Sequence, residues 1–325
     1  MPVFDRYLLN GMRKMLIAGI GGVGGTLAGV TLRRFPEEIT LYARGARRKA
    51  LAENGLVLHS ECYGDSMVGP VNVEEDASLL EEQDWVFICT KQYSLQTIAR
   101  QLAPCIGKDT VLIPLLNGIE APDLLRTMYP DNTVLDAVVY TISASLPDYS
   151  IEQKGNYSYI TLGHKYKDEK AMVIAREIAD TLAESGLDIR VSEDIESDIW
   201  QKYCLNCGYN SITALYLCDS GEIRRDPSKQ KELKSIMEEA ANVGRAAGVN
   251  LPADLAESKF RHVMEKQADS AVSSMERDME ARRPTENDTF LGALIRKAQE
   301  LNIQVPCCRD IYDRLKETEQ ERCHG

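Results

Sequence analysis

The stretch Met15-Leu16-Ile17-Ala18-Gly19-Ile20-Gly21-Gly22-Val23-Gly24 decides the fold of this chain. It is a short apolar strand that runs into the pattern G-x-G-x-x-G, and an amphipathic stretch, 25–35, follows at once. Such a loop predicts a dinucleotide site, because its glycines allow a tight turn, a close approach to a pyrophosphate and close helix packing. The pyrophosphate would lie at the helix N-terminus. The predicted cofactor-binding residues are Gly19, Gly21, Gly22, Val23 and Gly24; the alternative is a glycine-rich turn that binds nothing.

A second strand-like run, 39–43, ends at Arg44. An NAD site places a carboxylate near this point for the ribose 2′-hydroxyl, whereas a cation suits the 2′-phosphate of NADP. Arg47, Arg48 and Lys49 follow in a chain of net charge −12, and a local basic cluster against that background favours a phosphate. Arg44 therefore predicts NADP (NADPH) as the cofactor. The competing interpretation is a solvated helix start.

The two halves of the chain differ in their pattern. Strand-like runs at 15–20, 39–43, 85–90, 111–115 and 134–145 alternate with helical stretches, which predicts an α/β, Rossmann-type doubly wound parallel sheet. Residues 157–162 are expected to add an antiparallel edge strand, before a helix at 168–185. Helical patterns at 194–216, 228–247, 253–267 and 286–301 predict an all-α C-terminal domain. The expected domains are 1–193, with residues 1–14 as an N-terminal extension, and 194–325.

Composition narrows the class of partner and the compartment. The pI near 5.0 disfavours nucleic acid as a partner, and no apolar run approaches the roughly 18 residues that a membrane span needs. The N-terminus lacks the features of a signal peptide, so a cytoplasmic protein is expected. The polar end, 318–325, is expected to be loose.

The nine cysteines are scattered, and the C-x-x-C pair Cys204 and Cys207 falls inside a helical stretch. No second pair and no nearby histidine complete a zinc site, so we expect no metal and reduced thiols.

A polar stripe marks the helical half. Lys202, Asn206 and Asn210 are spaced i, i+4, i+8, so they line one face of a helix among apolar neighbours. Asparagine is a poor residue for a helix interior. The stripe is therefore interpreted as facing a ligand, with Lys202 as a proton donor whose pKa burial lowers toward neutrality. The alternative is a stripe that faces solvent.

Further candidates follow two apolar strands and lie in the last third of the chain. Lys91 and Asn117-Gly118 come where strands end, and the carboxyl ends of parallel strands bind ligands in such folds. Each has a plain alternative, a solvated charge for Lys91 and a turn for Asn117. Glu286 falls either in the first turn of a helix capped by Thr285 or at a catalytic position.

Taken together, the chain from about Met15 to Glu317 resembles the ketopantoate reductase family (2-dehydropantoate 2-reductases). The similarity is carried by an ordered set of segments: the glycine loop, Tyr42-Ala43-Arg44-Gly45, Glu53-Asn54-Gly55-Leu56, Thr90-Lys91, Pro114-Leu115-Leu116-Asn117-Gly118, Trp200-Gln201-Lys202 with Asn206 and Asn210, Ser273-Ser274-Met275, and Thr285-Glu286.

The resemblance implies reduction of the C2 ketone of ketopantoate by NADPH, which yields pantoate for pantothenate biosynthesis. Lys202 matches the general acid and Glu286 a catalytic or substrate-binding carboxylate. The positions that match cofactor contacts are Arg44, Lys91 and Asn117, and those that match substrate contacts are Asn117, Asn206, Asn210, Ser274 and Ser220. The partner is then a small 2-oxo acid, and the enzyme a monomer or homodimer.

Two departures leave the substrate open. Ser220 stands where the family often has an asparagine, and Leu291 where Asn-Gly is usual. A reductase of another 2-oxo acid is therefore the main alternative. A non-catalytic NADP-binding sensor is a weaker one, because a pure binder has no need of a proton donor.

Overall fold

The structure is a computed structural model that describes residues 13–324. It divides into two compact units. The first comprises the chain up to Leu116 together with Ala121–Glu193, and the second comprises Asn117–Glu120 together with the chain from Asp194 onward. Most of the expected N-terminal extension, 1–14, lies outside the described residues.

The first unit is built on a six-stranded parallel sheet in the order β5-β2-β1-β6-β7-β8. Its central strands β1, β6 and β7 are buried on both faces, which explains their continuous apolar sequences. The strands are β1 (Met15–Ala18), β2 (Ile39–Tyr42), β5 (Asn72–Glu74), β6 (Trp85–Ile88), β7 (Val111–Pro114) and β8 (Thr133–Val134).

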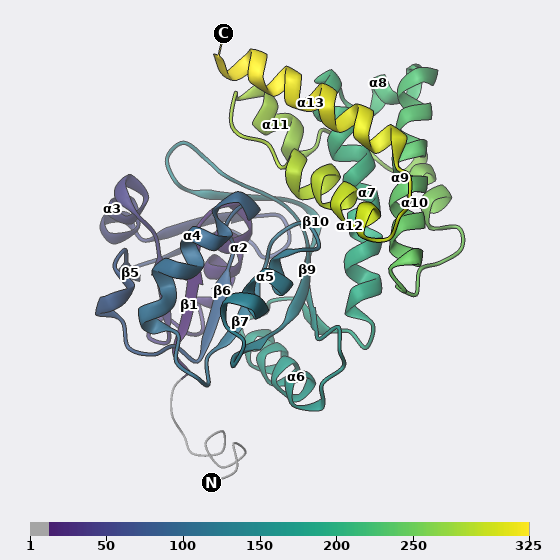
Figure 1. Ribbon diagram of the computed structural model, residues 1–325. Helices are drawn as coiled ribbons and strands as arrows, with labels where there is room; N and C mark the ends of the chain where they lie inside the picture. Colours follow the sequence, from purple (N-terminus) through teal and green to yellow (C-terminus); the bar gives the residue numbers. More distant parts are fainter. Residues whose placement is uncertain (1–12, 325) are drawn as a thin grey trace. The chain divides into compact units, whose positions relative to one another are not determined.

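Successive residues of β1 face two different cores, because side chains alternate along a strand. Met15 and Ile17 pack in a cluster with α2 (Gly22–Thr31), whereas Leu16 and Ala18 pack in another with α4 (Gln92–Leu102) and α5 (Ala121–Met128). Helices thus cover both faces of the sheet (Figure 1). The predicted Rossmann-type architecture is confirmed.

A second sheet completes this unit, in the order β11-β10-β3-β4 with β9 antiparallel to β10. The prediction of an edge strand at 157–162 was wrong. Strand β10 is long and central, because it pairs with β9 and also lies parallel to β3 and β11. The strands are β3 (Leu56–Ser60), β4 (Ser66–Val68), β9 (Asp136–Ser145), β10 (Ile151–Gly163) and β11 (Ile189–Val191). Helix α6 (Glu169–Ala183) packs against β10 and β11, whereas α3 (Gly45–Asn54) packs against β5 of the first sheet.

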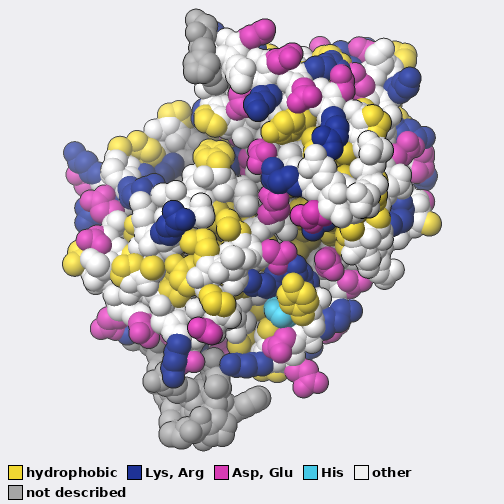
Figure 2. All heavy atoms as spheres, viewed as in Figure 1, with side chains coloured by type: hydrophobic (Ala, Val, Ile, Leu, Met, Phe, Trp, Pro, Cys, Tyr) yellow, Lys and Arg dark blue, Asp and Glu magenta, His cyan; other side chains and the backbone are white. Residues whose placement is uncertain are grey.

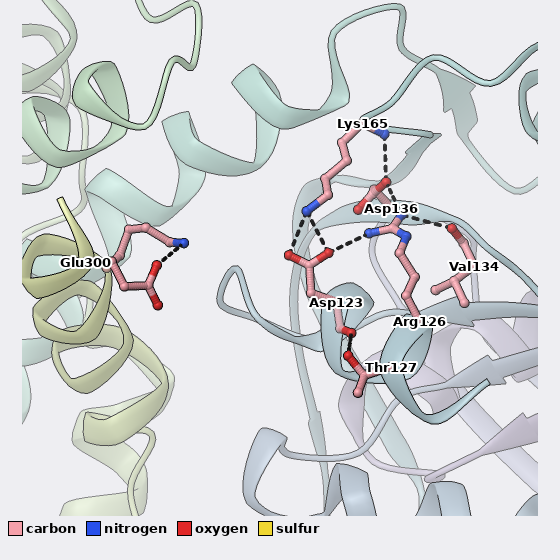
Figure 3. A network of polar contacts seen from close by, with 8 residues as sticks. Asp123, Arg126, Thr127, Val134, Asp136, Lys165 and Glu300 are labelled. Carbon is pink, nitrogen blue, oxygen red and sulfur yellow. Dashed lines mark hydrogen bonds and ion pairs between the residues drawn. The ribbon is translucent and has the colours of Figure 1, made fainter. Parts of the chain in front are cut away.

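A polar network fastens α5 to the start of β9 (Figure 3). Arg126 donates to Asp136, which is almost fully buried, at 2.6 Å and to Asp123 at 3.0 Å. Lys165 also belongs to the network, because its Nζ lies 2.6 Å from Asp123 Oδ1. The charges of this network therefore compensate one another, as partly buried charges require.

The second unit is helical, as predicted, and α7 (Ile195–Tyr216) is its longest helix. Helices α9, α10, α11 and α13 all contact it. The core gathers large side chains such as Trp200, Tyr203 and Phe290. The remaining helices are α8 (Ser220–Arg225), α9 (Pro227–Ala246), α10 (Leu255–Glu265), α11 (Ser274–Glu280), α12 (Ala293–Glu300) and α13 (Pro306–His324).

Two parts of this unit differ from the expectation. The helix expected over 286–301 is present, but it begins as a π-helical turn, Asp288–Gly292, and becomes α-helical only in α12. The end expected to be loose from Thr318 is helical to His324. Helix α13 is held because the Glu239 carboxylate accepts the N–H groups of Cys307 and Cys308 at 2.9 and 2.8 Å, and because Ile311 and Leu315 are fully buried.

Acidic and basic side chains are interspersed on the face of the molecule shown in Figure 2. Within residues 13–324, no helix is long and apolar enough to cross a membrane.

Candidate active site

The glycine turn of the first unit has the geometry that its sequence predicts. Gly19 adopts φ +94°, a left-handed conformation that favours glycine. A Cβ on Gly24 would lie 2.2 Å from the carbonyl oxygen of Gly19, so the helix can pack this close only without a side chain. At Gly21, in contrast, a Cβ would meet nothing within 4 Å. The protein therefore leaves space open where a pyrophosphate would approach.

Two buried hydroxyl groups beside this turn, Thr90 Oγ1 and Ser143 Oγ, have no hydrogen-bond partner among residues 13–324. Thr90 adjoins Gly19, and Ser143 adjoins Gly22. Buried polar groups are normally paired, and an orphaned one often marks the place of a ligand or water. The unpaired donors, the open space at Gly21 and the N-terminus of α2 together fit the phosphates of a dinucleotide.

Gly24 and Gly21 yield a pair of predictions, one for stability and one for nucleotide binding. Gly24→Ala should lower the melting temperature by about 5 °C or more, because its Cβ would overlap backbone that cannot move aside. Gly21→Ala should keep the melting temperature of the wild type yet bind NADPH at least about tenfold more weakly. Thermal unfolding and fluorescence titration measure the two quantities. A Gly21→Ala variant that binds the nucleotide normally would contradict the assignment of the turn.

Arg44 lies two residues after the end of β2 and is the N-cap residue of α3. Its side chain is exposed and donates to Gln101 Oε1 at 3.3 Å. Arg47, one turn along, donates to Ser145 Oγ and lies 4.8 Å from the ring centre of Tyr149. Its Nη1 is buried and has no partner in the described part of the chain. The basic side chains predicted at this point are thus present with guanidinium groups available to an anion.

Lys91 has the corresponding place after β6, as the N-cap residue of α4. Its role as a cofactor contact stays a prediction.

Lys202, on α7, has a hydrogen-bond partner far away in the sequence and a lowered pKa. Its Nζ donates to Asn117 Oδ1 at 2.9 Å, although the two residues are 85 positions apart. Burial lowers the pKa of Lys202 from 10.5 to about 8, an effect that the nearby carboxylate of Glu286 partly opposes. Glu286 itself is only 2% exposed. The structure therefore brings Lys202, Asn117 and Glu286 together, and gives the lysine a pKa suited to proton transfer near neutral pH.

The other residues of the polar stripe lie on the same helix, α7. Asn206 is half-buried and Asn210 is 6% exposed. Within the described part of the chain, no hydrogen bond is recorded for either amide, nor for the hydroxyl of Ser274. Buried amides without protein partners are available to a ligand. This arrangement supports substrate contacts for the three residues, which remain predictions.

Ser220 differs from these candidates. It is fully buried, and its Oγ lies 2.9 Å from Tyr209 Oη and 3.3 Å from the carbonyl oxygen of Ala271. A substrate contact by this hydroxyl would have to replace those bonds, so the contact stays a prediction that the geometry does not favour.

Two residues of this region were missed by the sequence analysis. Glu120 and Arg296 form an ion pair across 176 positions, with Arg296 Nη2 2.9 Å from Glu120 Oε2. Glu120 belongs to the same short segment as Asn117, which the contacts group with the helical unit. Neither residue lies in a motif, so only their distance in space reveals them.

The described cysteines are all free, and burial raises the pKa of Cys204 to about 12. Among the described residues, no group of three or more His, Cys, Asp or Glu side chains is placed to hold a metal ion.

The chain is similar to known proteins over most of its length. The chain is 30% identical to an uncharacterized oxidoreductase of Bacillus subtilis over 95% of this chain and all of that protein. It is 30% identical to a 2-dehydropantoate 2-reductase of Streptococcus pyogenes, over 81% of this chain and 84% of the relative. Among solved structures, a PanE/ApbA family ketopantoate reductase from Ralstonia eutropha matches with a TM-score of 0.85 and 27% identity, over 95% of this chain and 99% of that one. A D-mandelate dehydrogenase with NADH shares the fold, with a TM-score of 0.83, 22% identity, and 95% and 99% of the two chains covered.

The glycine turn, the partly buried Lys202 and these relatives together define an NAD(P)-dependent oxidoreductase. Two family models narrow the class, ketopantoate reductase PanE/ApbA over residues 15–167 and its C-terminal domain over residues 194–319. The chain belongs to the ketopantoate reductase family.

Proposed function

We propose that this protein reduces the C2 ketone of ketopantoate to the hydroxyl of pantoate with NADPH, a step of pantothenate biosynthesis. The observation that carries the proposal is the Lys202 ammonium group, held at 2.9 Å by Asn117 and with a pKa of about 8. The reduced nicotinamide, when bound, supplies the hydride. The ketone oxygen gains negative charge as the hydride arrives, and a proton donor placed there stabilises that charge.

Lys202 would supply this proton from its Nζ to the ketone oxygen and be left as the neutral amine. Asn117 orients the ammonium group by accepting one of its three N–H bonds. The carboxylate of Glu286 favours the charged form of the lysine, so it keeps part of the population protonated near pH 8. Asn206, Asn210 and Ser274 offer uncommitted polar groups for the substrate's carboxylate and hydroxyl.

We assign NADP rather than NAD as the cofactor because Arg44 stands where a carboxylate would select NAD. Free thiols fit a reducing cytoplasm, which we take as the site of the reaction. A monomer or homodimer stays our expectation for the assembly.

A second candidate is a reductase of another 2-oxo acid. Leu291 is fully buried and apolar where the family usually has asparagine, and the hydroxyl of Ser220 is committed to Tyr209 and Ala271. The pocket would then offer fewer polar groups to the substrate's hydroxyl than the family pattern does. A site without those donors discriminates less strongly in favour of a hydroxylated substrate.

A panel assay tests both candidates. NADPH oxidation is measured with ketopantoate and with 2-oxo acids that lack its hydroxyl or differ in branching. A clear preference in kcat/KM for ketopantoate supports the first candidate, and a preference for another acid supports the second. NADPH binding without turnover on any member of the panel would overturn both and favour a sensor.

The pH dependence follows from the pKa of Lys202. Because the protonated lysine is the donor, the rate of ketone reduction should be level below about pH 7 and fall tenfold per unit well above pH 8. Oxidation of the hydroxy acid needs the neutral amine, so it should rise through the same pH range. Glu286→Gln should move both midpoints to lower pH, because the carboxylate raises this pKa. Unchanged midpoints in that variant would contradict the coupling.

A further inference from the structure

The segment Asn117–Glu120 needs an anchor on the helical unit. Its first residue accepts the hydrogen bond from Lys202, so its placement sets where the ammonium group points. Ile119 packs against the hydrophobic core of that unit. Gly118 has φ +94°, and a Cβ there would lie 2.7 Å from Thr289 Cγ2, so the segment also fits closely against the π-helical turn.

The side chain of Arg296, on α12, holds the other end of this segment. Its Nε lies 3.0 Å from Glu120 Oε1 and its Nη2 2.9 Å from Glu120 Oε2, which is the two-pronged geometry of a guanidinium on a carboxylate. Such a pair fixes orientation as well as distance, because both groups are planar.

The remaining arm of the same guanidinium reaches the turn that follows Glu286. Nη1 of Arg296 lies 2.9 Å from Asp288 Oδ1, and Nη2 lies 3.3 Å from the Asp288 carbonyl oxygen. Tyr312 donates to the same carboxylate at 3.3 Å. Gly292 leaves room for this contact, because a Cβ there would lie 2.3 Å from Asp288 Oδ1.

We propose that Arg296 is a positioning residue for the reaction. It ties the segment that carries Asn117 to Asp288, two residues after Glu286, and both Asn117 and Glu286 act on Lys202. It touches none of the reacting atoms and works through Glu120 and Asp288. This inference rests on the proposed role of Lys202 as the proton donor.

The exposed fractions of the three side chains indicate that Arg296 contributes to positioning and not to stability. Side chains of Arg296, Glu120 and Asp288 are 43%, 38% and 67% exposed. Ion pairs this exposed add little to the stability of a fold. Geometry in an active site is more demanding, since a displacement of about 1 Å can cost up to about 100-fold in rate. We call the contacts of Arg296 with Glu120 and Asp288 the bridge. Loss of the bridge should therefore lower kcat and hardly change the free energy of unfolding.

The central test is Arg296→Gln, which removes the charge and keeps much of the length. We expect kcat to fall about tenfold or more, KM for NADPH to change less than about twofold, and the melting temperature to stay within about 2 °C. The pKa seen in the pH profile should rise from about 8 toward 10.5, because a looser Asn117 segment lets water reach Lys202.

Arg314→Gln is the matched control. Arg314 also lies in the helical unit and bonds two carboxylates and a tyrosine: Glu232 at 2.9 Å, Asp310 at 3.1 Å and Tyr216 at 2.6 Å. Its hydrogen bonds go to Glu232, Asp310 and Tyr216 and not to Glu120 or Asp288, so its loss should leave kcat and the pH profile as in the wild type. Arg296→Lys should restore part of kcat, because an ammonium group can serve one carboxylate well but not both.

A double-mutant cycle checks the bridge itself. Glu120→Gln and Asp288→Asn should each lower kcat, and combined with Arg296→Gln neither should lower it further. A substrate-free measurement, the pH dependence of Lys202 labelling by an amine reagent, should show the raised pKa in Arg296→Gln. Wild-type kcat and an unshifted labelling pKa in that variant would overturn the inference. Wild-type protein inactive on every 2-oxo acid, with the labelling shift still present, would instead overturn the proposed function alone.

Discussion

Lys202→Ala is expected to lower kcat for the reduction by about 1000-fold, within the 100- to 10,000-fold that a general acid contributes. The alanine variant has no proton to donate at the position that Asn117 holds in the wild type. Its affinity for NADPH should be unchanged, because the nucleotide turn belongs to the other unit of the protein. The melting temperature should stay the same or rise slightly, since removing a buried amine removes the cost of burying its charge.

Two further variants separate proton donation from charge. Lys202→Arg keeps a cation, but its guanidinium stays protonated at all working pH values, so we expect it to remain at least about 100-fold impaired. Gln201→Ala, at the neighbouring position on α7, should keep nearly full activity. Single-turnover absorbance at 340 nm measures the chemical step directly. More than a tenth of wild-type kcat in Lys202→Ala would show that another group or water delivers the proton.

The sequence predicts the geometry of the glycine turn well, because the requirements of this turn are local and steric. Gly19 must have a positive φ, and Gly24 must lie against the carbonyl of Gly19, so both demands are visible in ten consecutive residues. The stripe on α7 is predictable for the same reason, since a continuous helix fixes the angle between residues four apart.

The features that the sequence does not predict depend on contacts between residues far apart in the chain. The sequence places Asn117 at the end of a strand, as a ligand contact or a turn residue, whereas its bond to Lys202 spans 85 positions. The edge-strand prediction for 157–162 failed because a strand's neighbours in a sheet are set by the fold, and β10 gained three of them. The commitment of the Ser220 hydroxyl to Tyr209 is likewise visible only in the structure, and the substrate contact of Ser220 stays a prediction.

Arg44→Asp is expected to reduce kcat/KM for NADPH by about 100-fold or more and to leave the value for NADH within about threefold. A charged hydrogen bond to phosphate contributes about 1.5–3 kcal/mol, and tenfold in affinity corresponds to about 1.4 kcal/mol. The new carboxylate adds repulsion of the 2′-phosphate, beside Glu75, which already accepts the N–H of Gly45 at 3.2 Å. With NADH the same carboxylate can accept the ribose 2′-hydroxyl instead.

Lys49→Asp provides the control for general electrostatics. Lys49 lies on the same helix, is exposed, and has only a long contact of 3.9 Å with Glu53, yet its replacement changes the net charge by the same amount. If the loss of kcat/KM reflects the overall electrostatic field of the protein, it should appear in both variants and decrease with added salt. A loss that reflects direct contact should appear only in Arg44→Asp and only with NADPH. Equal weakening of NADPH and NADH by Arg44→Asp would refute the selector role and leave the choice of nucleotide to Arg47 or Lys91.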